Sequence, residues 1–263
     1  MNATPATAPT TRKKIAVAGA TGRLGRHVVD VLEEQGHDVV AISRAQGVDI
    51  VTGDGLAEAL HGVEVVIDSA GTPSPDQQVA TDFFTSAARN LRAAGEKAGV
   101  ARIAAVSIIG IEASVVGYNA AKPAHEHALL EGALPVRILR AAQFHEFVPQ
   151  LLAWGTQGDT GCVPRMGTQL VAARSVAEAL VGLALEEGSG TATAPFPEIA
   201  GPREESLVGA ATAYAAVHGP ATVQGVSDPA DPERDLFENG GLLPGPHATL
   251  AGPAFEEWAE GVN

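Results

Sequence analysis

Three glycines, Gly19, Gly22 and Gly25, follow directly after the apolar run IAVA. This G-x-x-G-x-x-G spacing, between an expected strand and an expected helix, is typical of the turn that binds the pyrophosphate of a dinucleotide. Gly19 permits the tight turn, Gly22 lets the backbone approach the phosphates, and Gly25 lets the helix pack closely on the strand. The helix N-terminus offers free N–H groups to the phosphates. The alternative is an ordinary glycine-rich turn, but the strand–turn–helix context favours a dinucleotide.

The residues after the second apolar run indicate which dinucleotide fits. Chains that bind NAD usually carry an acidic residue there, which bonds the ribose 2′-hydroxyl. This chain has Ser43 and Arg44 instead. An arginine suits a 2′-phosphate through a charge-assisted, often bidentate contact, and Arg23 in the glycine turn can reach the same group. We therefore expect NADP(H) to be preferred over NAD(H), the alternative being two solvated surface arginines.

Tyr118 and Lys122 form the second arrangement that could do chemistry. They are four residues apart, which is about one helical turn, so both side chains face the same way. An exposed tyrosine and a solvated lysine at the start of a helix are the alternative. His125 and His127 on the same helix are two apart and share no helical face, which argues against a metal site.

Alternating strands and helices must position these residues. We expect strands at 14–18, 38–43, 48–51, 63–67, 102–106 and 136–139, and helices at 24–35, 56–60, 76–98 and 120–130, from apolar spacing and glycine stops. The buried stripe of the longest helix is expected to be Val79, Phe83, Ala87, Leu91, Ala94 and Ala98. This alternation predicts an α/β fold with a doubly wound parallel sheet and helices on both of its faces.

The pattern changes after about residue 145, where proline and glycine become frequent. We expect a disordered tail over residues 1–13, a dinucleotide-binding core over 14–145, and a small C-terminal substrate lobe over 146–263, the last two forming one compact unit. Helices are expected at 176–185, 204–217 and 254–259, whereas 219–253 is hard to assign.

Several motifs in order give the chain a family resemblance. GATGRLG, VTGDG, VIDSAG, VSIIG, the Tyr118–Lys122 pair and ILRAAQFHEF stand in the order and spacing of the atypical short-chain dehydrogenase/reductases. More narrowly, the chain resembles their NmrA-like, NAD(P)H-binding branch, well over residues 14–147 and more loosely beyond. This branch holds carbonyl and quinone reductases, tailoring enzymes and non-catalytic redox sensors.

The resemblance implies roles for particular residues. Tyr118 would be the general acid for a carbonyl oxygen, Lys122 would bond the nicotinamide ribose and lower the pKa of the tyrosine, and Ser107 would orient the carbonyl. Ser114 is a second candidate for that last role. The predicted cofactor-binding residues are Gly19, Thr21, Gly22, Arg23, Leu24, Gly25, Ser43, Arg44, Asp54, Ser69, Ala70, Gly71 and Lys122.

Substrate contacts are expected where the sixth strand ends and the lobe begins. Phe144, His145 and Trp154 are the candidates there, and Phe144 and Trp154 would suit a flat hydrophobic ligand. His145 lies at the carboxyl edge of the sheet, where ligands bind. It could donate to a carbonyl or relay a proton, while a structural histidine bonded to the backbone is an equal alternative.

The amino-acid composition limits the kinds of partner that the protein is expected to bind. The net charge is −14 and the pI about 4.9, which argues against a nucleic-acid surface. No apolar run approaches the length of a membrane span. Cys162 is the single cysteine, so no disulfide can form within the chain. We expect a cytoplasmic protein that acts on a small hydrophobic molecule.

The expected function is therefore NADPH-dependent reduction of a carbonyl, a quinone or a polyketide-like ketone. One alternative is a regulator that binds NADP(H) without turnover. Another is a redox-neutral cyclase, isomerase or dehydratase on the same scaffold, because a fold does not fix a function. The presence of both Tyr118 and Lys122 favours an enzyme.

Overall fold

The computed structural model describes residues 11–188, 190–220 and 222–261. Most of the predicted tail therefore lies outside the described residues. Strands and helices alternate through the first half. They are β1 (Lys14–Ala18), α1 (Arg23–Glu34), β2 (Asp38–Ile42), α2 (Leu56–Ala59), β3 (Val65–Asp68), α3 (Gln77–Ala98), β4 (Arg102–Ile108), α4 (Gly117–Leu130) and β5 (Val136–Ala141).

The second half has shorter elements. They are α5 (Phe147–Gly155), β6 (Thr156–Gln157), β7 (Thr160–Pro164), β8 (Gly167–Thr168), α6 (Ala173–Leu185), β9 (Glu198–Ala200), β10 (Glu205–Ser206), α7 (Leu207–His218), β11 (Thr222–Val226), α8 (Arg234–Glu238), β12 (Thr249–Leu250) and α9 (Phe255–Glu260). In the described part of the chain, no helix has both the length and the apolar character needed to cross a membrane.

A parallel sheet of seven strands forms the centre of the molecule, in the order β12-β9-β5-β4-β3-β1-β2. The chain runs from β1 outward to β2 and then returns to β3 on the other side of β1. The strand order thus reverses between β1 and β3, and open α/β sheets bind their ligands at the carboxyl ends of such a pair. This topology confirms the predicted doubly wound fold.

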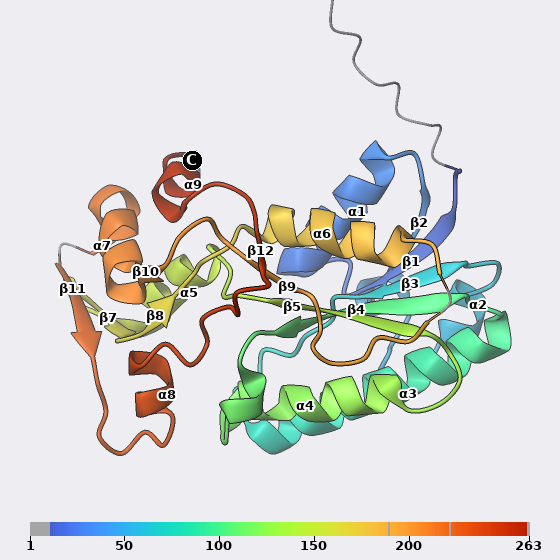
Figure 1. The fold of residues 1–263 in the computed structure, drawn as a ribbon, viewed down its shortest axis with the longest axis horizontal. Helices are drawn as coiled ribbons and strands as arrows, with labels where there is room; N and C mark the ends of the chain where they lie inside the picture. The colour runs from blue at the N-terminus through green and yellow to red at the C-terminus, as the bar shows by residue number, and fades with distance from the viewer. Residues whose placement is uncertain (1–10, 189, 221, 262–263) are drawn as a thin grey trace, which may run out of the picture.

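Helices cover both faces of the sheet (Figure 1). Helices α1 and α6 pack on one face with Ile15 and Val17 of β1, and α2, α3 and α4 pack on the other with Ala16 and Ala18. Successive residues of a strand point to opposite faces, so a strand buried on both sides is apolar throughout. This is why the run IAVA carries no polar residue.

The predicted strand at Val48–Val51 is wrong. A carboxylate oxygen of Asp49 accepts the backbone N–H of Val51 at 2.7 Å, and the amide of Asn90 in α3 donates to the carbonyls of Ile50 and Val51. Side chains therefore satisfy the backbone groups that a strand ladder would need. As a result, β2 stays at the edge of the sheet.

Helix α3 forms as predicted, but part of its buried stripe lies one residue later. Ala87 and Leu91 are buried as expected, whereas Phe84 is buried in place of Phe83, and Val79 is 52% exposed. The reason is that α3 packs against α4 as well as the sheet, and Phe84 lies in that seam against Ala121.

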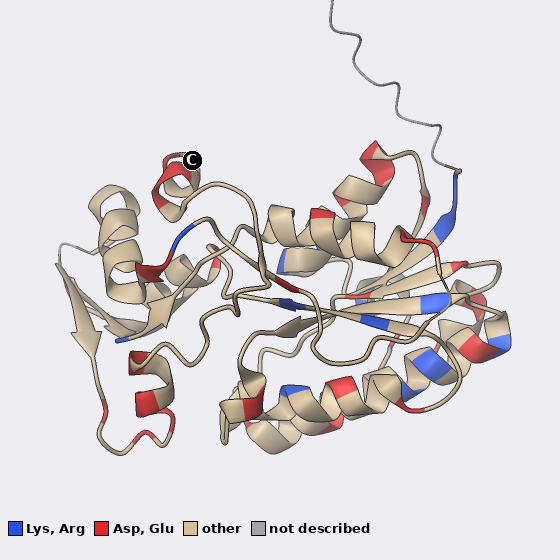
Figure 2. Ribbon diagram, viewed as in Figure 1, with Lys and Arg blue, Asp and Glu red and all other residues tan. Residues whose placement is uncertain are grey.

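The C-terminal part builds a lobe at one end of the sheet (Figure 1). Its core includes Val148 and Leu152 of α5, Val163 of β7, Leu207 of α7 and Phe255 of α9. Three later elements nevertheless join the first half: α6 packs on α1, and β9 and β12 extend the sheet beyond β5. Beyond residue 146 the chain thus returns to the first half twice, first with α6 and β9 and then with β12. Acidic residues lie on both parts (Figure 2).

Candidate functional site

The glycine turn joins β1 to α1 and packs against the end of β3. Gly19 has φ +75°, and a Cβ built on it would lie 2.8 Å from the Cα of Ala70. A Cβ on Gly25 would lie 2.0 Å from the carbonyl oxygen of Gly19. Both positions therefore require glycine, one for the turn and the other for the helix to lie close to it.

Gly22 is less crowded than Gly19 and Gly25, because a Cβ on it would meet only the Gly19 carbonyl oxygen, at 3.1 Å. It has an ordinary φ of −77° and is the N-cap of α1, where no side chain caps the helix. Its own N–H donates to the Gly19 carbonyl at 2.8 Å. The uncapped helix end, with no acidic residue in its first turn, is a cradle of N–H groups that fits a pyrophosphate.

The residues that were predicted to contact the 2′-phosphate of NADP(H) follow the end of β2. The Oγ of Ser43 is buried and has no hydrogen-bond partner among the described residues, and Arg44 is exposed beside it. Arg23 instead donates to Oε1 of Gln150 in α5 at 2.7 Å, so it ties the glycine turn to the lobe. Asp54 is exposed and accepts from the hydroxyl of Thr52.

The end of β3 meets the tyrosine of α4. Ser69 donates through Oγ to the carbonyl of Ala18, which ties β3 to β1 at the switch point. The hydroxyl of Tyr118 would lie 3.1 Å from a Cβ on Gly71, so this glycine makes room for it. Tyr118 thus reaches the sheet edge that also carries the glycine turn.

Lys122 lies one turn further along α4 and is only 3% exposed. Its Nζ donates to the carbonyl of Val106 at 3.1 Å, lies 2.8 Å from Nδ1 of His125, and stands 4.4 Å from the ring centre of Phe84. Burial lowers the pKa of Lys122 to about 8, against the opposing effects of Asp68 and Glu126. Lysine 122 is therefore held in the interior rather than solvated.

The pKa of Tyr118 rises instead of falling. Burial, together with the nearby carboxylate of Asp68, raises it to about 12. The expectation from the family resemblance was a lowered pKa. The difference has a physical cause, because the Lys122 ammonium is bonded to Val106 and His125 and Tyr118 lies among apolar side chains, including the ring of Phe84 at 5.3 Å.

Two residues that the sequence did not assign to this site lie directly beside it. Asp68, the last residue of β3, has an oxygen 3.0 Å from Nε2 of His125, and both side chains are buried. His127, by contrast, is exposed and faces Glu131. In the sequence, Asp68 ends an otherwise apolar strand, and because buried carboxylates are rare this is the signal that could have identified it.

A third such residue belongs to the lobe. Glu233, just before α8, is 4% exposed, and its carboxylate accepts the backbone N–H groups of Val115 and Val116 at 2.7 and 3.2 Å. This contact fixes the loop that leads into α4 and so the position of Tyr118. Glu233 lies 115 residues away from Tyr118 in the chain, and short-range spacing gives no hint of the pairing.

Ser107 lies on β4 next to the carbonyl that holds Lys122. It is 2% exposed, and its Oγ has no hydrogen-bond partner within the described residues. The Oγ of Ser114, on the following loop, is likewise buried and unpartnered there. A buried hydroxyl without a partner carries a cost in free energy, which a ligand group can remove.

The three predicted substrate residues each have different partners. His145 is fully buried; its Nε2 donates to the carbonyl of Leu170 at 3.1 Å, and its ring packs on Phe255 and Trp258. Burial lowers the pKa of His145 to about 4, so it is neutral at pH 7. This is the arrangement of the structural alternative, a histidine bonded to the backbone.

Phe144 and Trp154 differ in their surroundings. Phe144 is half-buried and its backbone bridges to Val171, while Trp154 is 67% exposed on α5 and meets Phe147 edge-on at 6.4 Å.

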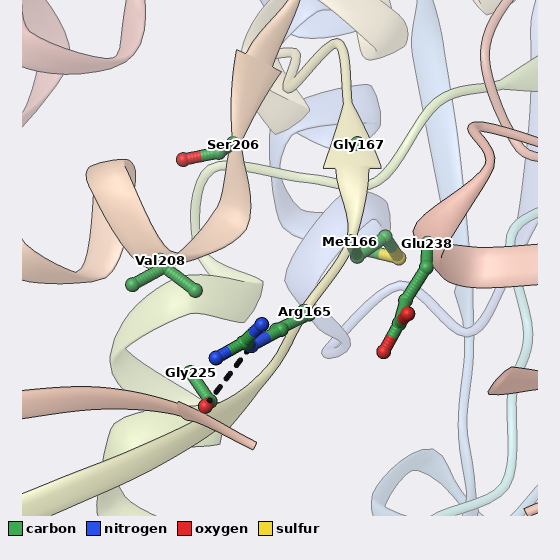
Figure 3. Close-up of a pocket in the computed structure, with 7 residues that line it drawn as sticks. All are labelled: Arg165, Met166, Gly167, Ser206, Val208, Gly225 and Glu238. Atoms are coloured by element: carbon green, nitrogen blue, oxygen red, sulfur yellow. Dashed lines mark hydrogen bonds between the residues drawn. The ribbon is translucent and has the colours of Figure 1, made fainter. Parts of the chain in front are cut away.

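A separate hollow of about 460 Å³ lies on the lobe (Figure 3). Arg165 and Glu238 flank it, and Arg165 donates to the carbonyl of Gly225. None of the residues predicted to be catalytic lines it. It therefore plays no part in the site described above.

Comparison with known protein families finds a match over more than half of the chain. The sequence profile of the NAD(P)H-binding family matches residues 19–187. The chain belongs to this NAD(P)H-binding family. The match begins at the first glycine of the turn and extends through α6, and it confirms the family resemblance drawn from the motifs. No curated protein matches the chain.

Solved structures share the fold. MoeE5 in complex with UDP-glucose and NAD has 18% identity and a TM-score of 0.69, covering 94% of this chain and 96% of its own. The dTDP-4-dehydrorhamnose reductase from Bacillus anthracis in complex with NADP has 17% identity and a TM-score of 0.68, and the match covers 95% of this chain and 98% of that one. The NADPH-dependent quinone oxidoreductase QOR2 from Escherichia coli has 20% identity and a TM-score of 0.62, and the match covers 94% of this chain and 98% of that one.

Proposed function

We propose that this member of the NAD(P)H-binding family is a reductase that transfers a hydride from NADPH to a carbonyl, a quinone or a polyketide-like ketone. The observation that carries the proposal is the place of the Tyr118 hydroxyl. It lies against Gly71 at the end of β3, on the sheet edge that holds the uncapped glycine turn. A protonated hydroxyl at this edge would be available to a carbonyl oxygen that gains negative charge as it is reduced.

NADPH, when bound, supplies the hydride, and the residues of this chain supply the rest. The N–H groups at the start of α1 hold the pyrophosphate. Tyr118, with a pKa of about 12, keeps its proton at pH 7 and can give it to the oxygen as negative charge develops there. The free Oγ of Ser107 can donate to the same oxygen and fix its orientation.

Arg44 is proposed to set the preference for NADPH over NADH. Replacing it with alanine should weaken NADPH binding by about 10- to 150-fold, because a phosphate–arginine contact contributes about 1.5–3 kcal/mol. Binding of NADH, which lacks the phosphate, should change little. Arg89→Ala removes an equally exposed arginine from α3 and is the matched control. Fluorescence titration measures the NADPH and NADH affinities of the parent and of both variants, and equal affinities of the parent for NADPH and NADH would remove the argument.

Turnover itself is tested by a screen. Purified protein with NADPH is mixed with a panel of quinones and aromatic ketones, and absorbance at the NADPH band is followed. We expect at least one compound to be reduced. NADPH binding at micromolar affinity with no turnover across the panel would replace the reductase by a protein that senses NADP(H).

A further inference from the structure

A chain of three ionisable groups is buried beneath Tyr118. It runs from Asp68 of β3 through His125 to Lys122, both of the latter on α4, with contacts of 3.0 and 2.8 Å. Their exposed fractions are 1%, 1% and 3%. The second oxygen of Asp68 accepts the backbone N–H of Ala70 at 3.0 Å, which fixes the carboxylate at the end of β3.

The partners determine where the protons lie. A carboxylate only accepts, so Nε2 of His125 carries the proton and donates it to Asp68. The other nitrogen, Nδ1, then presents a lone pair and accepts from the Lys122 ammonium. Burial alone would raise the pKa of Asp68, but the hydrogen bonds from His125 and Ala70 and the nearby positive charge together lower it below its usual value. Burial, together with the charge of Lys122, lowers the pKa of His125. The chain is therefore carboxylate, neutral imidazole and ammonium.

The three groups are almost fully removed from solvent. Phe84 of α3 packs against two of them, because the centre of its ring lies 4.8 Å from that of the His125 ring and 4.4 Å from Nζ of Lys122. The chain therefore has the Lys122 ammonium at one end and the Asp68 carboxylate at the other, joined through His125.

We propose that Asp68 and His125 are positioning residues that keep Lys122 charged and directed at the nicotinamide side of the site. Two of the three ammonium hydrogens are taken by Val106 and His125, which leaves one for the cofactor or Tyr118. This inference rests on the proposed function for its purpose, but the charge state of Lys122 can be measured without any turnover.

The other charges near Lys122 are accounted for element by element. On α4, the Glu126 carboxylate accepts two hydrogen bonds from the Arg140 guanidinium of β5, at 2.9 and 2.7 Å. On α3, Phe84 is uncharged, and β4 offers the Val106 carbonyl. Asp68 on β3 and Glu126 both favour the charged form of Lys122, and Asp68 has the larger effect.

The test is a pH titration of the lysine signals by NMR in the full chain without cofactor. The chain has only four lysines, at 13, 14, 97 and 122, so ε-¹³C-lysine labelling gives few signals, and Lys122→Arg identifies the one of interest. In the parent, Lys122 should titrate near 8. Asp68→Asn should lower this pKa by about one to three, because an opposite charge is lost nearby.

Variants of His125 separate positioning from simple packing. A glutamine side chain can accept a hydrogen bond from Lys122 and donate one to Asp68, so the pKa of Lys122 in His125→Gln should stay within about half a unit of the parent value. Leucine can do neither, so His125→Leu should lower the pKa of Lys122 by about one unit or more. His127→Leu removes an exposed histidine two residues on and should change nothing. If both Asp68→Asn and His125→Leu leave the Lys122 titration unchanged, the proposal is overturned.

Turnover provides an independent second readout. With an accepted substrate, the alkaline limit of kcat/KM should move to lower pH in Asp68→Asn and stay in place in His125→Gln. A protein without turnover would end the reductase proposal but leave the NMR result to decide this one. If Asp68→Asn does not fold, the His125→Gln and His125→Leu pair decides it.

Discussion

Tyr118→Phe should lower kcat on any accepted ketone by at least about 100-fold and change NADPH affinity by less than about threefold. The substitution removes one oxygen and no charge at pH 7, since the pKa of Tyr118 is about 12. The phenyl ring can keep its contact with Phe84, so the fold should survive. Steady-state kinetics and fluorescence titration measure the two quantities.

The chain offers a matched control, because its other tyrosine lies in the lobe. Tyr214 belongs to α7 and faces His218, so Tyr214→Phe should leave kcat unchanged. Full turnover in Tyr118→Phe would show that another group, such as the Ser107 hydroxyl or water, gives the proton. A quinone, which needs less help from an acid, should show a smaller loss than a ketone.

Gly22→Val should weaken NADPH binding by at least about 100-fold while the chain stays folded. A Cβ at this position would lie 3.1 Å from the Gly19 carbonyl, and the two methyl groups beyond it would enter the cradle at the start of α1. The backbone itself needs no change, because φ is −77°. Calorimetry gives the affinity, and circular dichroism gives the melting temperature.

Two other glycines provide comparison variants for this experiment. Gly182 is exposed on α6 with open space around its Cα, so Gly182→Val should bind NADPH normally. Gly25→Ala should instead destabilise the fold, because its Cβ would overlap the Gly19 carbonyl at 2.0 Å. Normal binding by Gly22→Val would mean that the glycine turn makes no close contact with a cofactor.

The sequence predicts the first half of the fold well, because its signals are local. The apolar run of β1, the glycine spacing and the periodic helix α1 each depend on residues that are neighbours in the chain. The parallel sheet then follows from strand–helix alternation. The strands β9 and β12, of three and two residues, are too short to carry a period, so their addition to the sheet could not be predicted.

The candidate site was predictable only in part, for the same reason. The Tyr118–Lys122 spacing lies within one helical turn, whereas Asp68 and His125 are 57 residues apart and meet only because β3 and α4 pack together. His125 in turn contacts the buried Lys122. Likewise, the expected strand at 48–51 failed because Asn90, some 40 residues away, bonds its carbonyls.

The most direct test of the reductase follows the hydride itself. NADPH carrying deuterium at C4 of the nicotinamide, prepared separately in each of its two stereochemical forms, is incubated with the protein and an accepted ketone. The product alcohol is then analysed by mass spectrometry. The proposed function predicts deuterium at the former carbonyl carbon from one form only, with one NADPH consumed for each alcohol formed. Bound but unconsumed NADPH, or an alcohol without deuterium from either form, would contradict it.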